Sequence, residues 1–223
     1  MTSQTRRNFL RKGACGTAAV ALGAVAAPAI QARGANERMV VGMIGCSGRG
    51  IAIGKELKKL DCKLPYAIDP DQTRAEHGKK VFESDHAGSD MRRIFDDKSV
   101  DAVAISAPNH WHAPAAVLGC QAGKHVYVEK PCSHNIVEGR KMIQAARRYD
   151  RVMQVGNQIR GTKVFQEGIA KLQAGAIGKV LVAKTWVSRK RPNIGHLQPS
   201  DPPAGLDYDQ WVGPAPMIPY QSN

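Results

Sequence analysis

Short apolar runs alternate along the chain with segments whose apolar residues recur at helical spacing. The runs are rich in Val, Ile and Ala and predict strands buried on both faces, while the spaced segments predict amphipathic helices. The predicted strands are residues 39–44, 64–68, 100–105, 125–128, 152–155 and 180–187. The predicted helices are residues 51–60, 71–82, 114–122, 135–149 and 162–174, with one further turn at 91–95. This alternation predicts an α/β fold with a doubly wound parallel sheet and right-handed crossovers.

The strand predicted at residues 125–128 ends in the charged pair Glu129 and Lys130, followed by Pro131. Burying such a pair is costly unless the charges are used, and ligands of open α/β sheets bind at the carboxyl ends of the strands. Lys130 is therefore a candidate for orienting or deprotonating a substrate hydroxyl. The alternative is an ordinary strand end whose charges are solvated.

A glycine-rich loop directly follows the first predicted strand and precedes a helix, with the sequence Gly45-Cys46-Ser47-Gly48-Arg49-Gly50. Glycines in such a loop allow a tight turn, close approach to a pyrophosphate and close helix–strand packing. Ser47 stands at the second glycine position, and Gly48 would take up the resulting strain. Asp69 ends the next strand, where its carboxylate would bind ribose hydroxyls and repel a 2′-phosphate, which favours NAD over NADP. The alternative is a structural turn with Asp69 as a helix cap.

A second polar strand end follows residues 100–105, with the sequence Ser106-Ala107-Pro108-Asn109-His110-Trp111-His112. Pro and Asn favour a turn there, close to the predicted cofactor. Asn109 or His112 would be within reach of ribose or nicotinamide. Each residue taken alone is more typical of a capping position, and Trp111 is more typical of packing than of stacking on a base.

The amino terminus predicts export. Arg6 and Arg7 precede an uncharged run at residues 13–29, which is too short and too weakly hydrophobic for a stable membrane span. Small residues follow, so residues 1–32 are predicted to be a twin-arginine signal peptide and residues 33–38 a linker. The predicted location is the periplasm or another exported compartment, with the twin-arginine translocase as a partner during export. An uncleaved amphipathic helix is disfavoured because the run has no polar face.

Composition excludes other classes. The formal net charge of +13 falls to +9 without the four basic residues of the predicted signal, and the remaining excess is scattered. Aromatic residues make up 5% of the chain and are not interleaved with the basic ones, which argues against nucleic-acid binding. The cysteines lack metal-type spacing, so no metal site is predicted.

Residues 39–158 are predicted to form a dinucleotide-binding domain, and residues 159–223 the beginning of a second, incomplete domain. The strand at 180–187 has no later strand to pair with, and seven prolines follow it. A loop of this length is uncommon inside a finished domain.

These motifs together resemble the glucose–fructose oxidoreductase/inositol dehydrogenase (Gfo/Idh/MocA) family. The resemblance runs from about Met39 to Tyr220 and includes the glycine loop, Asp69, and the segments at residues 107–112, 122–131 and 155–160. Residues 206–216 resemble an exported branch found in sugar-degrading bacteria. One part of the family pattern is missing from this sequence. Family members carry an Asp and a His on a helix of the second domain, and this pair has no counterpart before Asn223. The chain thus resembles the first half of such an enzyme.

The resemblance implies an amino-terminal Rossmann domain that binds NAD(P), and a carboxyl-terminal α/β domain that covers the substrate. Lys130 would be the catalytic residue, and the Lys130–Pro131 bond would be cis. Substrate binding is assigned to Lys130, Asn157 and Arg160. Cofactor binding is assigned to Gly45, Ser47, Gly48, Arg49, Gly50, Asp69, Pro108, Asn109, His112, Glu129, Lys130 and Gln158.

The expected function is transfer of a hydride between nicotinamide and a hydroxyl carbon of a sugar or cyclitol, with the protein supplying alignment. One alternative is a glycosidase of the same fold family that uses tightly held NAD. A non-enzymatic alternative is a nucleotide-binding fragment. The implied partner is a small carbohydrate, and a full-length protein would form a homo-oligomer.

Overall fold

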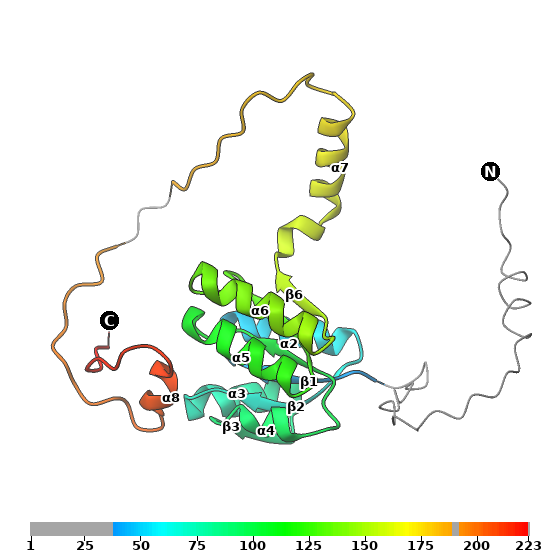
Figure 1. Cartoon of the computed structure of the whole chain (residues 1–223). Helices are drawn as coiled ribbons and strands as arrows, with labels where there is room; N and C mark the ends of the chain where they lie inside the picture. The colour runs from blue at the N-terminus through cyan, green and yellow to red at the C-terminus, as the bar shows by residue number, and fades with distance from the viewer. Residues whose placement is uncertain (1–37, 189–191, 223) are drawn as a thin grey trace, which may run out of the picture. The chain divides into compact units, whose positions relative to one another are not determined.

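A six-stranded parallel sheet forms the centre of the molecule, which is described by a computed structural model over residues 38–188 and 192–222 (Figure 1). The strand order is β3-β2-β1-β4-β5-β6, so the direction of winding reverses between β1 and β4. The strands are β1 (Val40–Ile44), β2 (Lys63–Ile68), β3 (His86–Gly88), β4 (Ala102–Ile105), β5 (His125–Glu129) and β6 (Met153–Gly156). This order and the alternating helices confirm the predicted Rossmann-type sheet.

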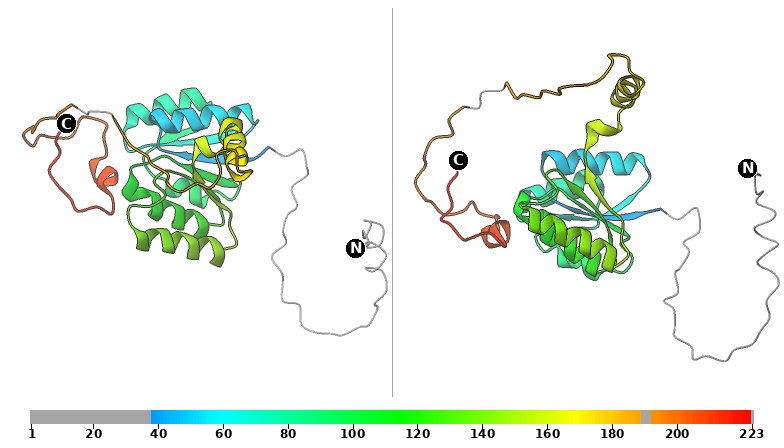
Figure 2. Two further views of the ribbon diagram at one scale, coloured as in Figure 1. Left: turned by 90° about the horizontal axis from the view of Figure 1, so that it is seen from above. Right: turned by 45° about the horizontal axis from the view of Figure 1, so that its top comes forward.

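Helices cover both faces of the sheet. In Figure 2, α2 and α3 lie on one face, while α5 and α6 lie on the other. The helices of the sheet domain are α2 (Gly48–Lys59), α3 (Gln72–Phe82), α4 (Arg92–Asp96), α5 (Asn109–Gln121) and α6 (Ile136–Arg148). The chain continues through η1 (Gln158–Gly161), α7 (Lys163–Gln173) and α8 (Tyr208–Val212).

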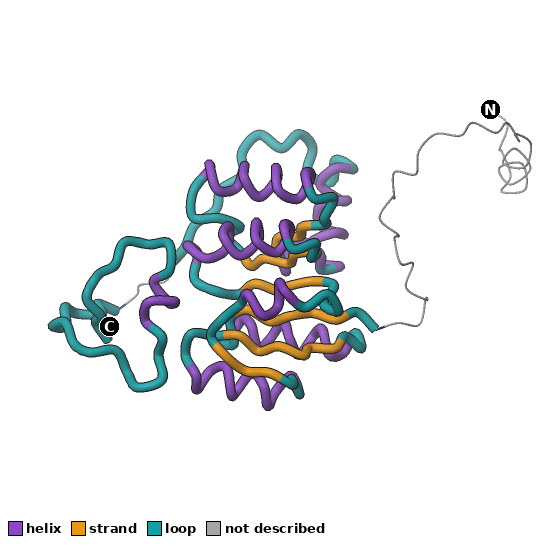
Figure 3. Tube along the Cα trace, turned by 60° about the horizontal axis from the view of Figure 1, so that its bottom comes forward, coloured by secondary structure: helices purple, strands orange, loops and turns teal. Residues whose placement is uncertain are grey.

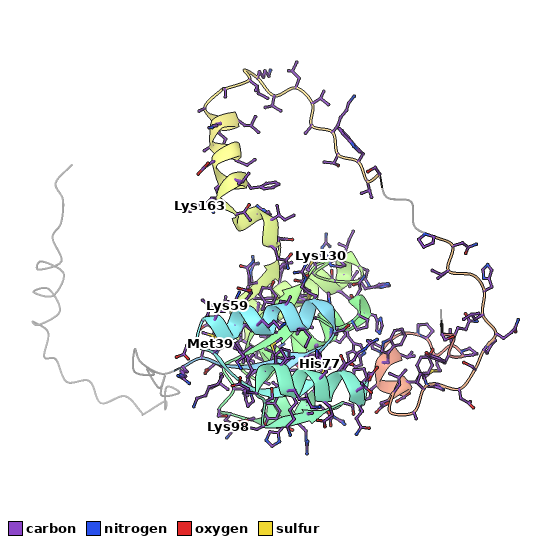
Figure 4. All side chains as sticks on the ribbon, turned by 180° about the vertical axis from the view of Figure 1, so that it is seen from behind. Met39, Lys59, His77, Lys98, Lys130 and Lys163 are labelled. Carbon is purple, nitrogen blue, oxygen red and sulfur yellow. The ribbon has the colours of Figure 1, made fainter. Side chains whose placement is uncertain are left out.

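The strands are buried on both faces, which explains their continuous apolar sequence. One core cluster includes Val103, Ile105 and Val128, and the other includes Met43 and Phe82. These two clusters hold the carboxyl ends of β1, β4 and β5 in fixed positions at one edge. Figure 4 labels Met39, which precedes β1, and Lys130, which follows β5. Met39 marks the side of the sheet where the strands begin, and Lys130 marks the side where they end.

Two helices begin earlier than the sequence predicted. Helix α2 begins at Gly48 instead of residue 51, and α5 begins at Asn109 instead of residue 114. The turn expected after β4 is therefore the first turn of α5, because Pro108 occupies its N-cap and proline is compatible with a helix start. Asn135 caps the amino terminus of α6: its Oδ1 accepts from Glu138 N at 3.0 Å, and the Glu138 carboxylate accepts from His134 N at 2.8 Å.

The prediction of a strand at residues 180–187 is wrong. These residues are exposed and adopt no regular element, and no strand in residues 38–188 or 192–222 lies beside them to complete a ladder. Figure 3 shows loop along most of the chain between α7 and α8. The sequence also missed the three-residue strand β3 and helix α8, both of which are too short to show a periodic pattern.

The predicted signal at residues 1–32 and most of the predicted linker lie outside the described residues. Within the described part of the chain, none of the helices has the length and apolar character needed to cross a membrane.

Candidate functional site

The loop between β1 and α2 requires glycine at its first and last positions. Gly45 has φ +91°, a conformation that favours glycine, and a β-carbon there would lie 2.6 Å from the carbonyl group of Ser106. A β-carbon at Gly50 would overlap the carbonyl oxygen of Gly45. Gly48 differs, because it lies in the helix with open space around it. Ser47 itself adopts an ordinary extended conformation, and the role of Gly48 in accommodating an approaching phosphate stays a prediction.

The amino terminus of α2 is built to face an anion. Ser47 is the N-cap residue, and its side chain makes no capping hydrogen bond. The first amides of a helix have no partner inside the helix, and the helix dipole favours negative charge there. The first turn of α2 contains no acidic residue that would compete with a phosphate.

Asp69 lies directly after β2 and fixes the glycine loop. Its Oδ2 accepts a hydrogen bond from Cys46 N at 2.8 Å, and its Oδ1 accepts one from Asp71 N at 3.0 Å. The side chain that caps α3 is that of Asp71, so Asp69 is not the helix cap. Each carboxylate oxygen has a second lone pair, which leaves Asp69 able to accept ribose hydroxyls.

Burial raises the pKa of the Asp69 carboxyl above its usual range, and the amide hydrogen bonds from Cys46 and Asp71 oppose this rise. Burial, followed by the nearby charge of Asp69, raises the pKa of the Cys46 thiol to about 12. Cys46 is therefore a neutral thiol at physiological pH, packed in the core cluster that includes Met43 and Phe82.

A cavity of about 230 Å³ opens beside the loop at the switch point between β1 and β4. Four residues of the predicted cofactor set line it: Gly45, Ser47, Asp69 and Pro108. The buried hydroxyl of Ser106 also faces this cavity and lacks a hydrogen-bond partner among the described residues. An unpaired buried hydroxyl, a carboxylate and a helix amino terminus fit the adenosine and phosphate groups of a dinucleotide.

The other lining residues were not assigned to the site from the sequence, and among them are Arg74, Ser89, Trp111, Gln210 and Trp211. Gln210 and Trp211 come from α8, and Gln210 follows the nearest preceding lining residue, Trp111, by 99 residues. No local pattern indicates such a return of the chain. Arg74 is paired with Asp71 at 3.4 Å and follows it by one helical turn, a spacing that was visible in the sequence.

A second cluster surrounds Glu129 at the end of β5. The Glu129 side chain is buried, and it contacts Arg49 Nε at 3.6 Å and the amide nitrogen of Gln158. Its other oxygen accepts from Lys130 N at 3.1 Å, while the Lys130 side chain is exposed. Glu129 therefore connects the nucleotide loop, the lysine and the loop after β6. The Lys130–Pro131 bond is cis, as the resemblance implied.

His112 is buried, so the predicted direct contact with ribose or nicotinamide is replaced by a positioning role. Its Nδ1 lies 2.6 Å from the carbonyl oxygen of Pro131, and its Nε2 lies 2.8 Å from that of Ala107. The ring thus holds the turn after β5 against the turn after β4.

Three other predicted residues are not joined to these clusters. Asn109 is exposed and does not line the cavity. Asn157 and Arg160 are also exposed, and no hydrogen bond or ion pair in the described residues links their side chains to Lys130. Within residues 38–188 and 192–222, no group of three or more His, Cys, Asp or Glu residues is placed to hold a metal ion.

The strand order, the glycine loop and the position of Asp69 define a dinucleotide-binding Rossmann domain. A family model described as "Oxidoreductase family, NAD-binding Rossmann fold" (Gfo/Idh/MocA) matches residues 39–157. The chain belongs to this Gfo/Idh/MocA oxidoreductase family.

Similar proteins include dehydrogenases of cyclitols. The myo-inositol 2-dehydrogenase of Thermotoga maritima is 28% identical over 172 residues, which are 76% of this chain and 48% of that protein. The inositol 2-dehydrogenase of Rubrobacter xylanophilus is 30% identical over 165 residues, or 69% of this chain and 45% of that protein. The crystal structure of an NAD binding oxidoreductase from Klebsiella pneumoniae matches with a TM-score of 0.58 and 30% identity, covering 64% of this chain and 40% of that one. The chain spans about half the length of these curated relatives.

Proposed function

We propose that the protein is an exported, NAD-dependent oxidoreductase that transfers a hydride between nicotinamide and a hydroxyl carbon of a sugar or cyclitol. The observation that carries this proposal is the ion pair between Arg49 and Glu129. It joins the first turn of α2, where the phosphates would bind, to the strand end that carries Lys130. The similarity to inositol dehydrogenases supports the substrate class.

In this proposal different groups at the carboxyl ends of the strands bind different parts of the dinucleotide. The cavity beside Asp69 holds the adenosine, and the start of α2 holds the pyrophosphate. Because a cavity of about 230 Å³ is smaller than a typical whole-ligand pocket, the rest of the dinucleotide extends along the edge toward β5. NAD, when bound, supplies a carbon that accepts or returns the hydride.

In this proposal Lys130 is the residue that accepts the proton of the substrate hydroxyl. Its amine would hold the substrate hydroxyl by a hydrogen bond and take the hydroxyl proton as the hydride leaves the same carbon. Glu129 keeps the lysine backbone in place through its bond to Lys130 N, and Gln158 and Arg49 keep Glu129 in place.

NAD is proposed over NADP because the buried carboxylate of Asp69 would face the 2′-position of the ribose. Arg74 lies in the same cavity and could attract a 2′-phosphate, but its Nε faces the Asp71 carboxylate at 3.4 Å. The charge of Arg74 is thus partly neutralised by Asp71, whereas no ion pair within 4 Å joins Asp69 to a basic side chain in the described residues.

Replacing Asp69 tests the nucleotide site. We expect Asp69→Asn to weaken NAD binding by about 10-fold or more, since a hydrogen bond to a charged group contributes about 1.5–3 kcal/mol. The preference for NAD over NADP should narrow at the same time. Because the pKa of Asp69 is raised, wild-type affinity for NAD should fall as the pH is lowered through that pKa, and this slope should vanish in Asp69→Asn. Calorimetric titration measures all three effects.

Asp150→Asn is the matched control for this titration. It removes an exposed carboxylate that does not line the cavity, and asparagine tolerates the positive φ of +51° at this position as aspartate does. Equal NAD affinity in the wild type and Asp69→Asn would remove Asp69 from the site.

Export is proposed from the sequence of residues 1–32. Replacing Arg6 and Arg7 by lysine should leave the precursor in the cytoplasm, because the twin-arginine route reads the arginine pair. Cell fractionation with an immunoblot measures this, and changing Arg11 to lysine in the same basic stretch is the control. A normally processed exported product from the double variant would overturn the signal assignment.

A further inference from the structure

Residues 205–213, here named the cover segment, lie against the carboxyl edge of the sheet. Asp207 N donates to the carbonyl of Pro70 at 2.9 Å, and Gln72 N donates to the carbonyl of Gly205 at 2.9 Å. These two bonds attach the start of the cover segment to the turn directly after Asp69. Residues 192–204, which directly precede the segment, form no helix or strand, so its position depends on contacts of this kind.

The start of α5 holds the other end of the cover segment. Trp111 Nε1 donates to the carbonyl of Gln210 at 2.9 Å, and His110 Nε2 lies 3.0 Å from the carbonyl of Trp211. Gly213 has φ +52°, and a β-carbon there would overlap the indole ring of Trp111. The cover segment therefore packs directly against Trp111, and position 213 has no room for a residue larger than glycine.

Two side chains of the cover segment face the cavity beside Asp69. Trp211 is 37% exposed and its ring lies nearly parallel to that of Tyr208, with 5.9 Å between centroids and 13° between planes. The amide nitrogen of Gln210 lies 3.3 Å from Ser89 Oγ on the same wall. A flat aromatic face beside a polar amide is the combination that recognises a planar, polar-edged base.

We propose that the cover segment forms the outer wall of the adenine subsite, with Trp211 and Gln210 as nucleotide-contacting residues. This inference rests on the proposed function, because it takes the cavity to hold the adenosine of the dinucleotide. The base occupies this place because the opposite wall holds Asp69 for the ribose and the loop for the phosphates. The segment thus couples a distant part of the chain to nucleotide affinity.

The first test is titration of the chain with NAD and with ADP-ribose, which lacks nicotinamide. Trp211→Ala should weaken the binding of both ligands by the same factor of about 10, since stacking on a base is lost. Trp186→Ala is the matched control, because Trp186 is 79% exposed and does not line the cavity.

A second variant tests the segment without changing a lining residue. Gly213→Ala should push the segment away from Trp111 and weaken ADP-ribose binding by a similar factor. Gly178→Ala is its control, because Gly178 also has a positive φ, at +70°, but a β-carbon there meets no atom within 4 Å. Circular dichroism of each variant checks that the sheet domain remains folded.

The outcomes distinguish a failure of this inference from a failure of the proposed function. If the wild type binds both ligands and both variants bind within about twofold of it, the cover segment is not part of the subsite, and the proposed function stands. If the wild type binds neither ligand, the proposed function fails and the inference fails with it. Parallel losses in Trp211→Ala and Gly213→Ala, with unchanged controls, support the inference.

Discussion

Gly50→Ala is expected to abolish measurable NAD binding and to lower the free energy of unfolding by about 1–3 kcal/mol, the usual cost of overpacking. A β-carbon at this position overlaps the carbonyl oxygen of Gly45, and a second backbone atom, the Gly45 carbonyl carbon, lies only 2.9 Å away. Backbone atoms cannot turn aside as a flexible side chain can. The start of α2 must therefore move away from β1, and the phosphate site moves with it.

The measurement is a denaturant melt combined with calorimetric titration of NAD. Gly168→Ala is the matched control, because Gly168 lies in an exposed part of α7 with no atom within 4 Å of a β-carbon. There the same substitution should stabilise the helix by up to about 1 kcal/mol. Wild-type affinity for NAD in Gly50→Ala would mean that the nucleotide does not bind at this loop.

Lys130→Met is expected to lower turnover by about 10²–10⁴-fold while leaving NAD affinity within about twofold of the wild type. Methionine has a similar length but has no amine to hold or accept a proton. The lysine side chain is exposed, so its loss leaves the core intact. Steady-state kinetics of the natural gene product and NAD titration together measure this split.

Lys141→Met, on the exposed surface of α6, is the control for this substitution. A loss of NAD binding in Lys130→Met would make the lysine part of the nucleotide site. Unchanged turnover would remove it from the chemistry altogether.

The sheet could be predicted from the sequence because its strands are buried on both faces and read as continuous apolar runs. The end of β5 stood out for the same reason, since Glu129 and Lys130 interrupt such a run. The glycine loop could also be predicted from neighbouring residues alone, because positions 45 and 50 accept only glycine. These features depend on neighbours that are close in the chain.

The features that the sequence missed depend on distant contacts. Gln210 and Trp211 reach the cavity because α5 and the turn after Asp69 bind the cover segment, and no periodic pattern records that contact. His112 is a comparable case. Its type and position suggested a ligand contact, but its ring nitrogens face two backbone carbonyls that come together only in the folded chain.

The most direct test of the proposed hydride transfer uses cyclitols and sugars deuterated at their hydroxyl-bearing carbons, each incubated with NAD and the natural gene product. Mass spectrometry of the recovered cofactor shows whether deuterium has moved. We predict that deuterated NADH accumulates with the wild type and Lys141→Met and is nearly absent with Lys130→Met. Recovery of NAD without deuterium, or cleavage of an aryl glycoside without net NADH, would contradict the proposed function.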